Sequence, residues 1–330
     1  MKAYVSKAVF LVAFALCVRV ETQEPRPPRP VRNDVPKAGR EILVLRNHEL
    51  KAGGHESFYQ LSRDLYWPFF ERLGARVVGQ WKVIGGANAA TMDDAYRLVR
   101  YASFEHWQAT RQGPDVGLGG NGPAWEQGQR GLGDRGGLQT GSKGAYFLEG
   151  VMAPDGPRFM PGLAEDYERV DTGQRPASTD EKIPVRAGAA VPGREVVELR
   201  YQRIRKGGFD RFAADTLARI WPWEEKLGAR PIGQWKVVHP AAPNRTAESA
   251  DFDEVITMTR YASAEHRQAM SLNEAVYMGG NGPDWQAWRA ALDAQRTVTL
   301  DTRTELMEGH MFQSPAVYLP ALPEGYRPVK

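Results

Sequence analysis

The sequence predicts an α+β fold built from two tandem copies of one unit, because three stretches occur twice within its 330 residues. Residues 67–83 match residues 221–237 at an offset of 154 (221 − 67), and both end in Gly-Gln-Trp-Lys-Val. Arg-Tyr-Ala-Ser at 100–103 returns at 260–263, and Gly-Gly-Asn-Gly-Pro at 119–123 returns at 279–283. A repeat of this length constrains the architecture before any single element is assigned.

The first part of each unit reads as strand, helix, strand. A strand is expected from residue 41 to 48, a Gly-Gly turn at 53–54, and a helix that runs toward Trp67, where Pro68 should kink or end it. Leu73-Gly74 then stops the helix. In the strand that follows, alternation predicts Val77, Gly79, Trp81 and Val83 on one face, with Arg76, Val78, Gln80 and Lys82 on the other.

The second part reads as strand, helix, short helix, strand. A third strand is expected over 95–101, Ser103 caps the next helix, and Pro123 opens a further short helix. A fourth strand ends near residue 152. This β-α-β-β-α-β order is the ferredoxin-like one. Each unit leaves one sheet face uncovered, so we expect the two units to pair as an intramolecular pseudo-dimeric α+β barrel.

Composition and local patterns set the expected domain boundaries. Residues 1–20 carry a short apolar run typical of an export signal, and 21–40 form a Pro/Arg-rich tether. The repeat units span 41–170 and 195–330, joined by a linker at 171–194. The sequence therefore predicts an exported protein, periplasmic or extracellular, without a transmembrane segment. It leaves open whether signal peptidase I or lipoprotein processing removes the signal.

Charge and cysteine content narrow the classes of function. The net charge of +3, with arginines scattered through both units, gives no support for nucleic-acid binding. Cys17 is the only cysteine and lies in the signal segment, so neither disulfides nor thiolate chemistry are expected in the mature chain. No His or Cys cluster has metal-ligand spacing, and no metal is predicted. Oligomerisation beyond the pseudo-dimer is left open.

The motif Leu-Gly-Ala-Arg-x-x-Gly-Gln-Trp, followed by an acidic residue six positions before Arg-Tyr-Ala-Ser-x-Glu, resembles the NIPSNAP family within the dimeric α+β barrel superfamily. The resemblance covers both units and implies the barrel fold. It brings no catalytic residues with it, since NIPSNAP-like domains have no agreed catalytic set. Better-known barrel relatives include antibiotic-biosynthesis-type monooxygenases and haem-dependent chlorite dismutases, so haem is the cofactor that the resemblance suggests. The export signal and the Gly-Gly-Asn-Gly-Pro insert depart from the family.

Two sets of residues are candidates for a site. The first is the helical pair Glu105-His106 with its copy Glu265-His266, where an imidazole could act as base or ligand and a packing role is the alternative. The second is a polar strand face that should line the space between the two sheets and bind a carboxylate or another small anion, or else form a wet sheet-to-sheet contact. Its members are Arg46, Gln80, Lys82, Arg97 and Tyr101, with their second copies Arg200, Gln234, Lys236, Thr257 and Tyr261.

Two classes of function remain after this reading. One is an exported module that binds a small, anionic molecule between the sheets, or a structural pseudo-dimer without turnover. The other is an oxidoreductase or monooxygenase-like enzyme, cofactor-independent or haem-assisted. The chain lacks an evident nucleophile, metal cluster and nucleotide motif, which favours the first class. The sequence does not decide whether the protein is an enzyme, and it identifies neither a cofactor nor a ligand.

Overall fold

The structure is a computed structural model. It describes residues 41–72, 75–85, 92–101, 103–111, 123–152, 195–226, 229–240, 247–261, 263–271 and 283–311. The expected signal segment, tether and linker, together with the C-terminal tail of each unit, lie outside these residues. Below, the described residues up to 152 are called the first half, and those from 195 onward the second half.

Both halves contain the elements that the repeat predicts. The strands are β1 (Ile42–Lys51), β2 (Arg76–Ile84), β3 (Met92–Tyr101), β4 (Gln139–Gly141), β5 (Ala145–Met152), β6 (Val196–Arg205), β7 (Arg230–Val238), β8 (Phe252–Tyr261) and β9 (Thr299–Met311). The first-half helices are α1 (His55–Leu61), η1 (Ser62–Tyr66), α2 (Trp67–Arg72), α3 (Phe104–Ala109) and α4 (Pro123–Gly136). The second-half helices are α5 (Phe209–Asp215), η4 (Thr216–Ile220), α6 (Trp221–Lys226), α7 (Ala264–Ser271) and α8 (Pro283–Val298).

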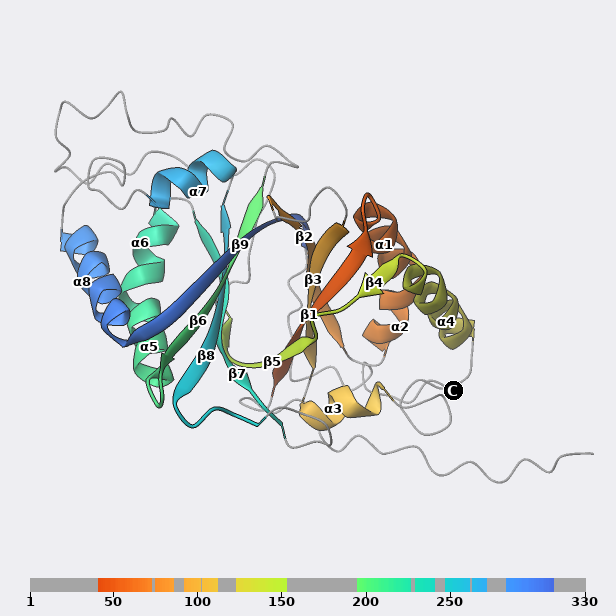
Figure 1. The fold of residues 1–330 in the computed structure, drawn as a ribbon, viewed down its shortest axis with the longest axis horizontal. Helices are drawn as coiled ribbons and strands as arrows, with labels where there is room; N and C mark the ends of the chain where they lie inside the picture. Colours follow the sequence, from red (N-terminus) through yellow and green to blue (C-terminus); the bar gives the residue numbers. More distant parts are fainter. Residues whose placement is uncertain are drawn as a thin grey trace, which may run out of the picture.

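The strands form one closed antiparallel barrel. Their order is β3-β2-β9-β6-β8-β7-β5-β1, and β1 also pairs with β3, which closes the ring. The short β4 adds to the edge of β1, whereas its counterpart in the second half is the first part of the longer β9. The helices lie outside the barrel on two opposite sides, α1, α2 and α4 beside the first-half sheet and α5, α6 and α8 beside the second-half sheet (Figure 1). The chain is therefore an α+β antiparallel barrel.

Two seams join the halves, because the last strand of each half pairs with the second strand of the other. β5 pairs with β7 and β2 pairs with β9, and the registers agree: Trp235 lies opposite Gly150, and Trp81 lies opposite Gly309. A side chain at Gly150 would meet the carbonyl oxygen of Gln234 at 2.4 Å, and one at Gly309 would meet that of Gln80 at 2.4 Å. Glycine at these two positions lets the strands approach closely enough to pair.

The inside of the barrel is filled with apolar side chains from both halves, because a ring of eight strands has an interior just wide enough for side chains to fill. They include Leu43, Leu45, Trp81, Tyr96, Leu98, Leu148, Leu199, Trp235, Ile256, Met258 and Met307. The expectation that the polar strand face lines the space between the two sheets is therefore wrong. Arg46 shares its face with Val44, which packs beneath the helices among Tyr66 and Phe70, so the polar face is the outer one.

The expected alternation along the second strand is also wrong at one point. Val78 faces the barrel interior together with Trp81, while Val77 packs on the helix side. The cause is a register shift between Val77 and Gly79, a bulge that adds one residue to this strand. The same shift recurs between Pro231 and Gly233, where proline has no N–H to give to the ladder.

The helix expected to break at Pro68 continues through it. Instead of a break there is one π-helical turn, η1, just before Pro68, in which the N–H of Trp67 donates to the carbonyl oxygen of Ser62. η4 repeats this turn before Trp221 and Pro222. Each wide turn places an aromatic or long apolar residue, Tyr66 or Ile220, toward the sheet, where both are buried.

We expect G150A and G309A each to lower the free energy of unfolding by about 1–3 kcal/mol, the usual cost of overpacking. The reason is the backbone clash at the seams. G133A is the matched control, since nothing lies within 4 Å of a side chain there and alanine favours a helix. Urea unfolding of the three variants measures the differences. Seam variants as stable as G133A would contradict this account of the glycines.

Candidate functional site

A row of polar side chains crosses three neighbouring strands on the outer face of the first half. Arg46 on β1 lies opposite Arg97 on β3, and Arg97 lies opposite Gln80 on β2. Arg97 is 3% exposed and Gln80 is fully buried. The strand register thus brings two guanidinium groups and one amide together beneath the helices.

Two further arginines complete what we call the arginine cluster, Arg46, Arg97, Arg111 and Arg135. Arg135, in the last turn of α4, is 2% exposed, and its Cζ lies 4.3 Å from the ring centre of Tyr66. Arg97 approaches the same ring at 5.8 Å. Arg111 follows α3 and lies 5.3 Å from the ring centre of Trp107. Aromatic faces thus give the cluster weak cation–π partners.

Within the described part of the chain, the positive charge of the cluster has no matching negative charge, because no carboxylate there forms an ion pair with any of its arginines. Five buried guanidinium nitrogens have no hydrogen-bond partner: Nε of Arg46, and Nε and Nη1 of both Arg97 and Arg135. Both amide atoms of Gln80 are likewise unpaired. A buried donor left unpaired costs about 1–3 kcal/mol, and more when it is charged.

The pKa values of three of these arginines are lowered by the same surroundings. Burial lowers the pKa of Arg46 and Arg97, and lowers that of Arg135 well below its ordinary value. Neighbouring arginines add to each of these shifts, because like charges disfavour one another, and the nearby tyrosines oppose them. An anion placed among these groups would offset both the cost of burying the charges and the repulsion between the arginines.

His48 belongs to the same surroundings, two residues beyond Arg46 on the same strand face. It is 1% exposed, its Nδ1 lies 2.9 Å from Oε1 of Gln139, and its Nε2 has no partner. Burial, followed by the charges of Arg97 and Arg135, lowers the pKa of His48 well below 6.5. The imidazole is therefore neutral, and its Nε2 offers one more polar atom to the cluster.

The second half repeats the row but neutralises it. Arg200, Thr257 and Gln234 take the places of Arg46, Arg97 and Gln80, and Gln234 donates to Thr257 Oγ1 at 3.1 Å. Glu198, 3% exposed, accepts from Arg200 at 2.6 Å and from Arg267 with its other oxygen. Although burial lowers it, the pKa of Arg200 is raised overall, mainly by the Glu198 carboxylate.

The helix above the second-half row stands farther out and leaves a pocket of about 480 Å³. Trp288 on α8 takes the place of Gly128 on α4. A side chain at Gly128 would lie 3.0 Å from Cβ of Phe69, so α4 sits close on the helices beneath it. The pocket is lined by Glu198, Arg200, Gln202, Glu224, Tyr261, Arg267, Met270, Trp288, Leu292, Gln295, Arg296, Thr299, Thr302 and Thr304.

The two predicted lysines lie away from the cluster and have structural partners. Lys82 Nζ lies 3.1 Å from Asp93, and Lys236 Nζ lies 3.2 Å from Asp253. Both aspartates are almost fully buried, and Asp253 also accepts from the backbone of Gly207 at 2.8 Å. These ion pairs tie the strand ends to the turn that precedes the first helix of each half.

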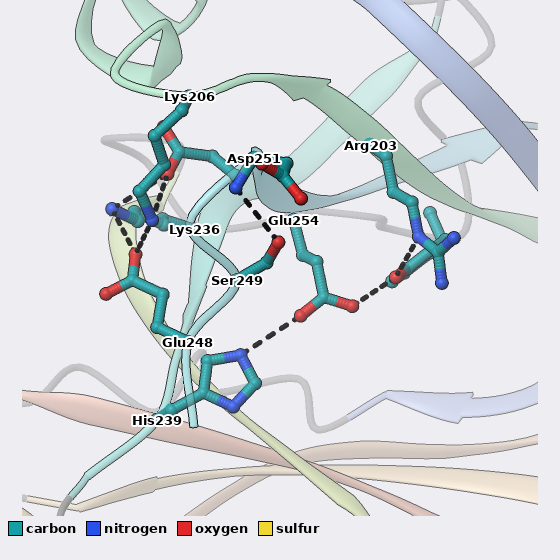
Figure 2. A network of polar contacts seen from close by, with 10 residues as sticks. Arg203, Lys206, Lys236, His239, Glu248, Ser249, Asp251 and Glu254 are labelled. Atoms are coloured by element: carbon teal, nitrogen blue, oxygen red, sulfur yellow. Dashed lines mark hydrogen bonds and ion pairs between the residues drawn. The ribbon is translucent and has the colours of Figure 1, made fainter. Parts of the chain in front are cut away.

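In the second half this ion pair grows into a larger polar network (Figure 2). Lys206 and Lys236 both reach Glu248, at 2.7 and 2.9 Å, and lower its pKa to about 2. Beside them, His239 Nε2 lies 3.0 Å from Glu254, which accepts a hydrogen bond from Tyr201. Each of these side chains already has a partner within the network, so the network offers no unpaired group to a ligand.

Tyr101, Tyr261 and His106, three of the residues named from the sequence, pack inside the fold. Tyr101 and Tyr261 are buried, and burial raises the pKa of each. His106 is fully buried with its ring 5.5 Å from that of Tyr101, whereas the neighbouring Glu105 is exposed. Glu265 and His266 lie in α7, and their side chains are outside the described part of the structure.

The haem that the barrel relatives suggest does not fit His106. An axial ligand needs an imidazole nitrogen open to a cavity. The His106 ring is enclosed, lying edge-on to Tyr101, and it is not among the residues that line the 480 Å³ pocket. We therefore derive no step through haem. Among the described residues, no group of three or more His, Cys, Asp or Glu side chains could hold a metal ion.

Three members of this site were not predicted from the sequence: His48, Arg111 and Arg135. His48 had a signal, since it follows Val44 and Arg46 at spacing two on one strand face. Arg135 had a weaker one, because the repeat aligns it with Gln295 at an offset of 160 (295 − 135). Nothing in the sequence indicates that Arg111 lies beside the strands.

Comparisons with known proteins identify no function for this chain. No family model matches the chain, and no curated protein matches it. Among solved structures it is similar to an anthrone oxidase-like protein, with 13% identity, a TM-score of 0.43, and 86% of this chain and 97% of that one covered. It is also similar to a chlorite dismutase mutant from Candidatus Nitrospira defluvii, with 10% identity, a TM-score of 0.39, and 86% and 97% covered respectively.

A NIPSNAP family protein from Agrobacterium tumefaciens aligns at 21% identity with a TM-score of 0.25, over 37% of this chain and 90% of that one. Identities and TM-scores this low carry no activity or ligand across. In the described residues, no helix is both long and apolar enough to cross a bilayer.

We expect H48Q to remove part of the acid sensitivity of the fold. The unfolded chain binds a proton at His48 near pH 6.5, whereas the folded chain keeps the imidazole neutral. Since the unfolded state then binds more protons, the free energy of unfolding falls as the pH drops below 6.5, by up to about 1.4 kcal/mol per pH unit. Glutamine, the residue at the matching position 202, does not titrate. Urea unfolding at pH 5, 6 and 7 measures both slopes, and equal slopes would contradict the assignment.

Proposed function

We propose that this protein binds a small anionic molecule at the arginine cluster of the first half, between the sheet and the covering helices. The observation that carries the proposal is a set of buried guanidinium groups with unpaired N–H donors and no described carboxylate partner. An isolated buried charge is costly enough that proteins pair it or bind a counter-ion. Arginine suits this role, because its planar fork holds an oxyanion through two parallel hydrogen bonds.

The surroundings favour a small ligand. Gly131 of α4 lies against the η1 turn, where an added side chain would come within 2.6 Å of Cβ of Leu65. The helix therefore packs closely over the cluster, and the guanidinium groups of Arg97 and Arg135 both approach the ring of Tyr66. A ligand held here would be surrounded by cations and aromatic rings, with neutral His48 and Gln80 as further polar contacts.

The experiment is a thermal-shift titration with acetate, benzoate, phosphate and sulfate at constant ionic strength. At least one of these anions should raise the melting temperature in a saturable way, since ligand at 100 times Kd stabilises the folded state by about 2.7 kcal/mol. If none does so while chloride has the same effect as all of them, the proposal is wrong.

Arg97→Met gives the proposal a second and opposite signature. This variant keeps the length of the side chain and removes a buried, unpaired charge, so the ligand-free protein should be as stable as the wild type or more stable. Anion binding should weaken by about 1.5–3 kcal/mol, the worth of a charge-assisted hydrogen bond. Arg205→Ala is the matched control, because it removes the same charge from an exposed position on β6. Equal losses of binding in the two variants would indicate unspecific charge attraction.

We also propose that each half is a ferredoxin-like unit and that the chain is a distant relative of the NIPSNAP proteins. The strand order β2-β3-β1-β5 in the first half, repeated as β7-β8-β6-β9 in the second, supports the first statement. The repeated sequence motif supports the second.

Export remains a proposal that rests on the apolar run before Arg19. Mass spectrometry of the N-terminal peptide from the native host tests it. Residues 1 to about 20 should be missing from the mature protein, and an intact Met1 or Lys2 would contradict export by this signal.

A further inference from the structure

The two halves differ most at the positions that surround the paired arginines Arg46 and Arg200. In the second half, the carboxylates of Glu198 and Glu224 lie there; at the matching positions, offset by 154, the first half has Val44 and Phe70. The difference is one of charge, since two carboxylates of the second half correspond to two hydrocarbon side chains in the first.

Glu198 shows what an anion does in this setting. Its side chain is 3% exposed, and its two oxygens receive the guanidinium groups of Arg200 and Arg267 separately. One planar carboxylate thus satisfies two arginines from opposite sides, and the second half needs no further counter-ion for them. The residue lies two positions before Arg200 on the same strand face, as Val44 does relative to Arg46.

Building on the proposed function, we infer that the ligand of the first half is a small carboxylic acid with an apolar body, and that Glu198 is the built-in counterpart of its carboxylate. The ligand carboxylate would lie over Val44 and be held by Arg46 together with Arg97 or Arg135. The second half has this group as part of its own chain, and the first half takes it from solution.

The apolar neighbours support a carboxylic acid over inorganic phosphate. Val44 and Phe70 belong to one buried apolar cluster, and Trp107, which takes the place of Arg267, packs against it. Phosphate carries oxygen on all sides and would leave those facing this cluster without donors. A carboxylate presents its two oxygens on one side and an apolar body on the other, which matches arginines on one side and aromatic carbon on the other.

The test is calorimetric titration of the full chain with benzoate and with phosphate, for the wild type and for V44E. V44E copies the second half and places a carboxylate beside Arg46. Wild-type protein should bind benzoate more tightly than phosphate, and V44E should weaken benzoate binding by about 10- to 100-fold, the worth of one charge-assisted contact. V44Q is the matched control: it has the same size without the charge, and should bind benzoate more tightly than V44E does.

E198V/E224F provides an independent readout in the open pocket of the second half. It places the first-half residues, valine and phenylalanine, at both carboxylate positions beside Arg200 and Arg267, so benzoate should bind at two sites per chain where the wild type has one. A stoichiometry that stays at one site per chain overturns the inference. This outcome can be read even if V44E and V44Q fail to fold. Wild-type protein that prefers phosphate, or V44E with wild-type affinity, overturns the carboxylate assignment and leaves the anion site standing. Wild-type protein that binds neither anion overturns the proposed function itself.

Discussion

The strand pairing across the two seams is the constraint on which the rest of the structure depends. Because β5 of the first half pairs with β7, and β9 of the second half pairs with β2, the two sheets close on each other as one ring. The interior of that ring is then filled by large apolar side chains such as Trp81 and Trp235, both almost fully buried. Polar chemistry is thereby displaced to the outer face, where the helices decide how much of it stays accessible.

Under those helices the two halves balance the charge of their arginines differently, although both have the same arrangement of strands and helices. The second half pairs Arg200 and Arg267 with the carboxylate of Glu198 and has Trp288 on α8 where α4 has a glycine. The first half gathers more arginines, has Val44 where the carboxylate would be, and brings α4 close through Gly128 and Gly131. An open pocket with paired arginines and a closed arginine cluster thus occupy corresponding places in one molecule.

The repeat made the order of elements and the pairing of the halves readable from the sequence, because equal spacing in two copies constrains both. It also indicated Arg46 and Gln80 as members of one polar strand face, and they do lie in one row. The side on which that face lies was not readable. Alternation gives two faces without saying which one is inward, and the bulge at Gly79 reverses the parity partway along β2. Lys82 shares the face, but it forms an ion pair with the buried Asp93 on the neighbouring strand. Arg135 comes from a helix whose depth depends on two glycines, which no strand pattern encodes.

The covalent link between the halves has an evolutionary consequence. A single unit of this kind would present β2 and β5 as open edges, and two identical copies would have to close them for each other. In such a symmetric dimer, one codon determines the same residue in both sites, so valine in one site and glutamate in the other could not coexist. Covalent linkage of two copies in one chain lifts that restriction. One half can then pair its arginines with a carboxylate of the chain, while the other keeps valine at the same position.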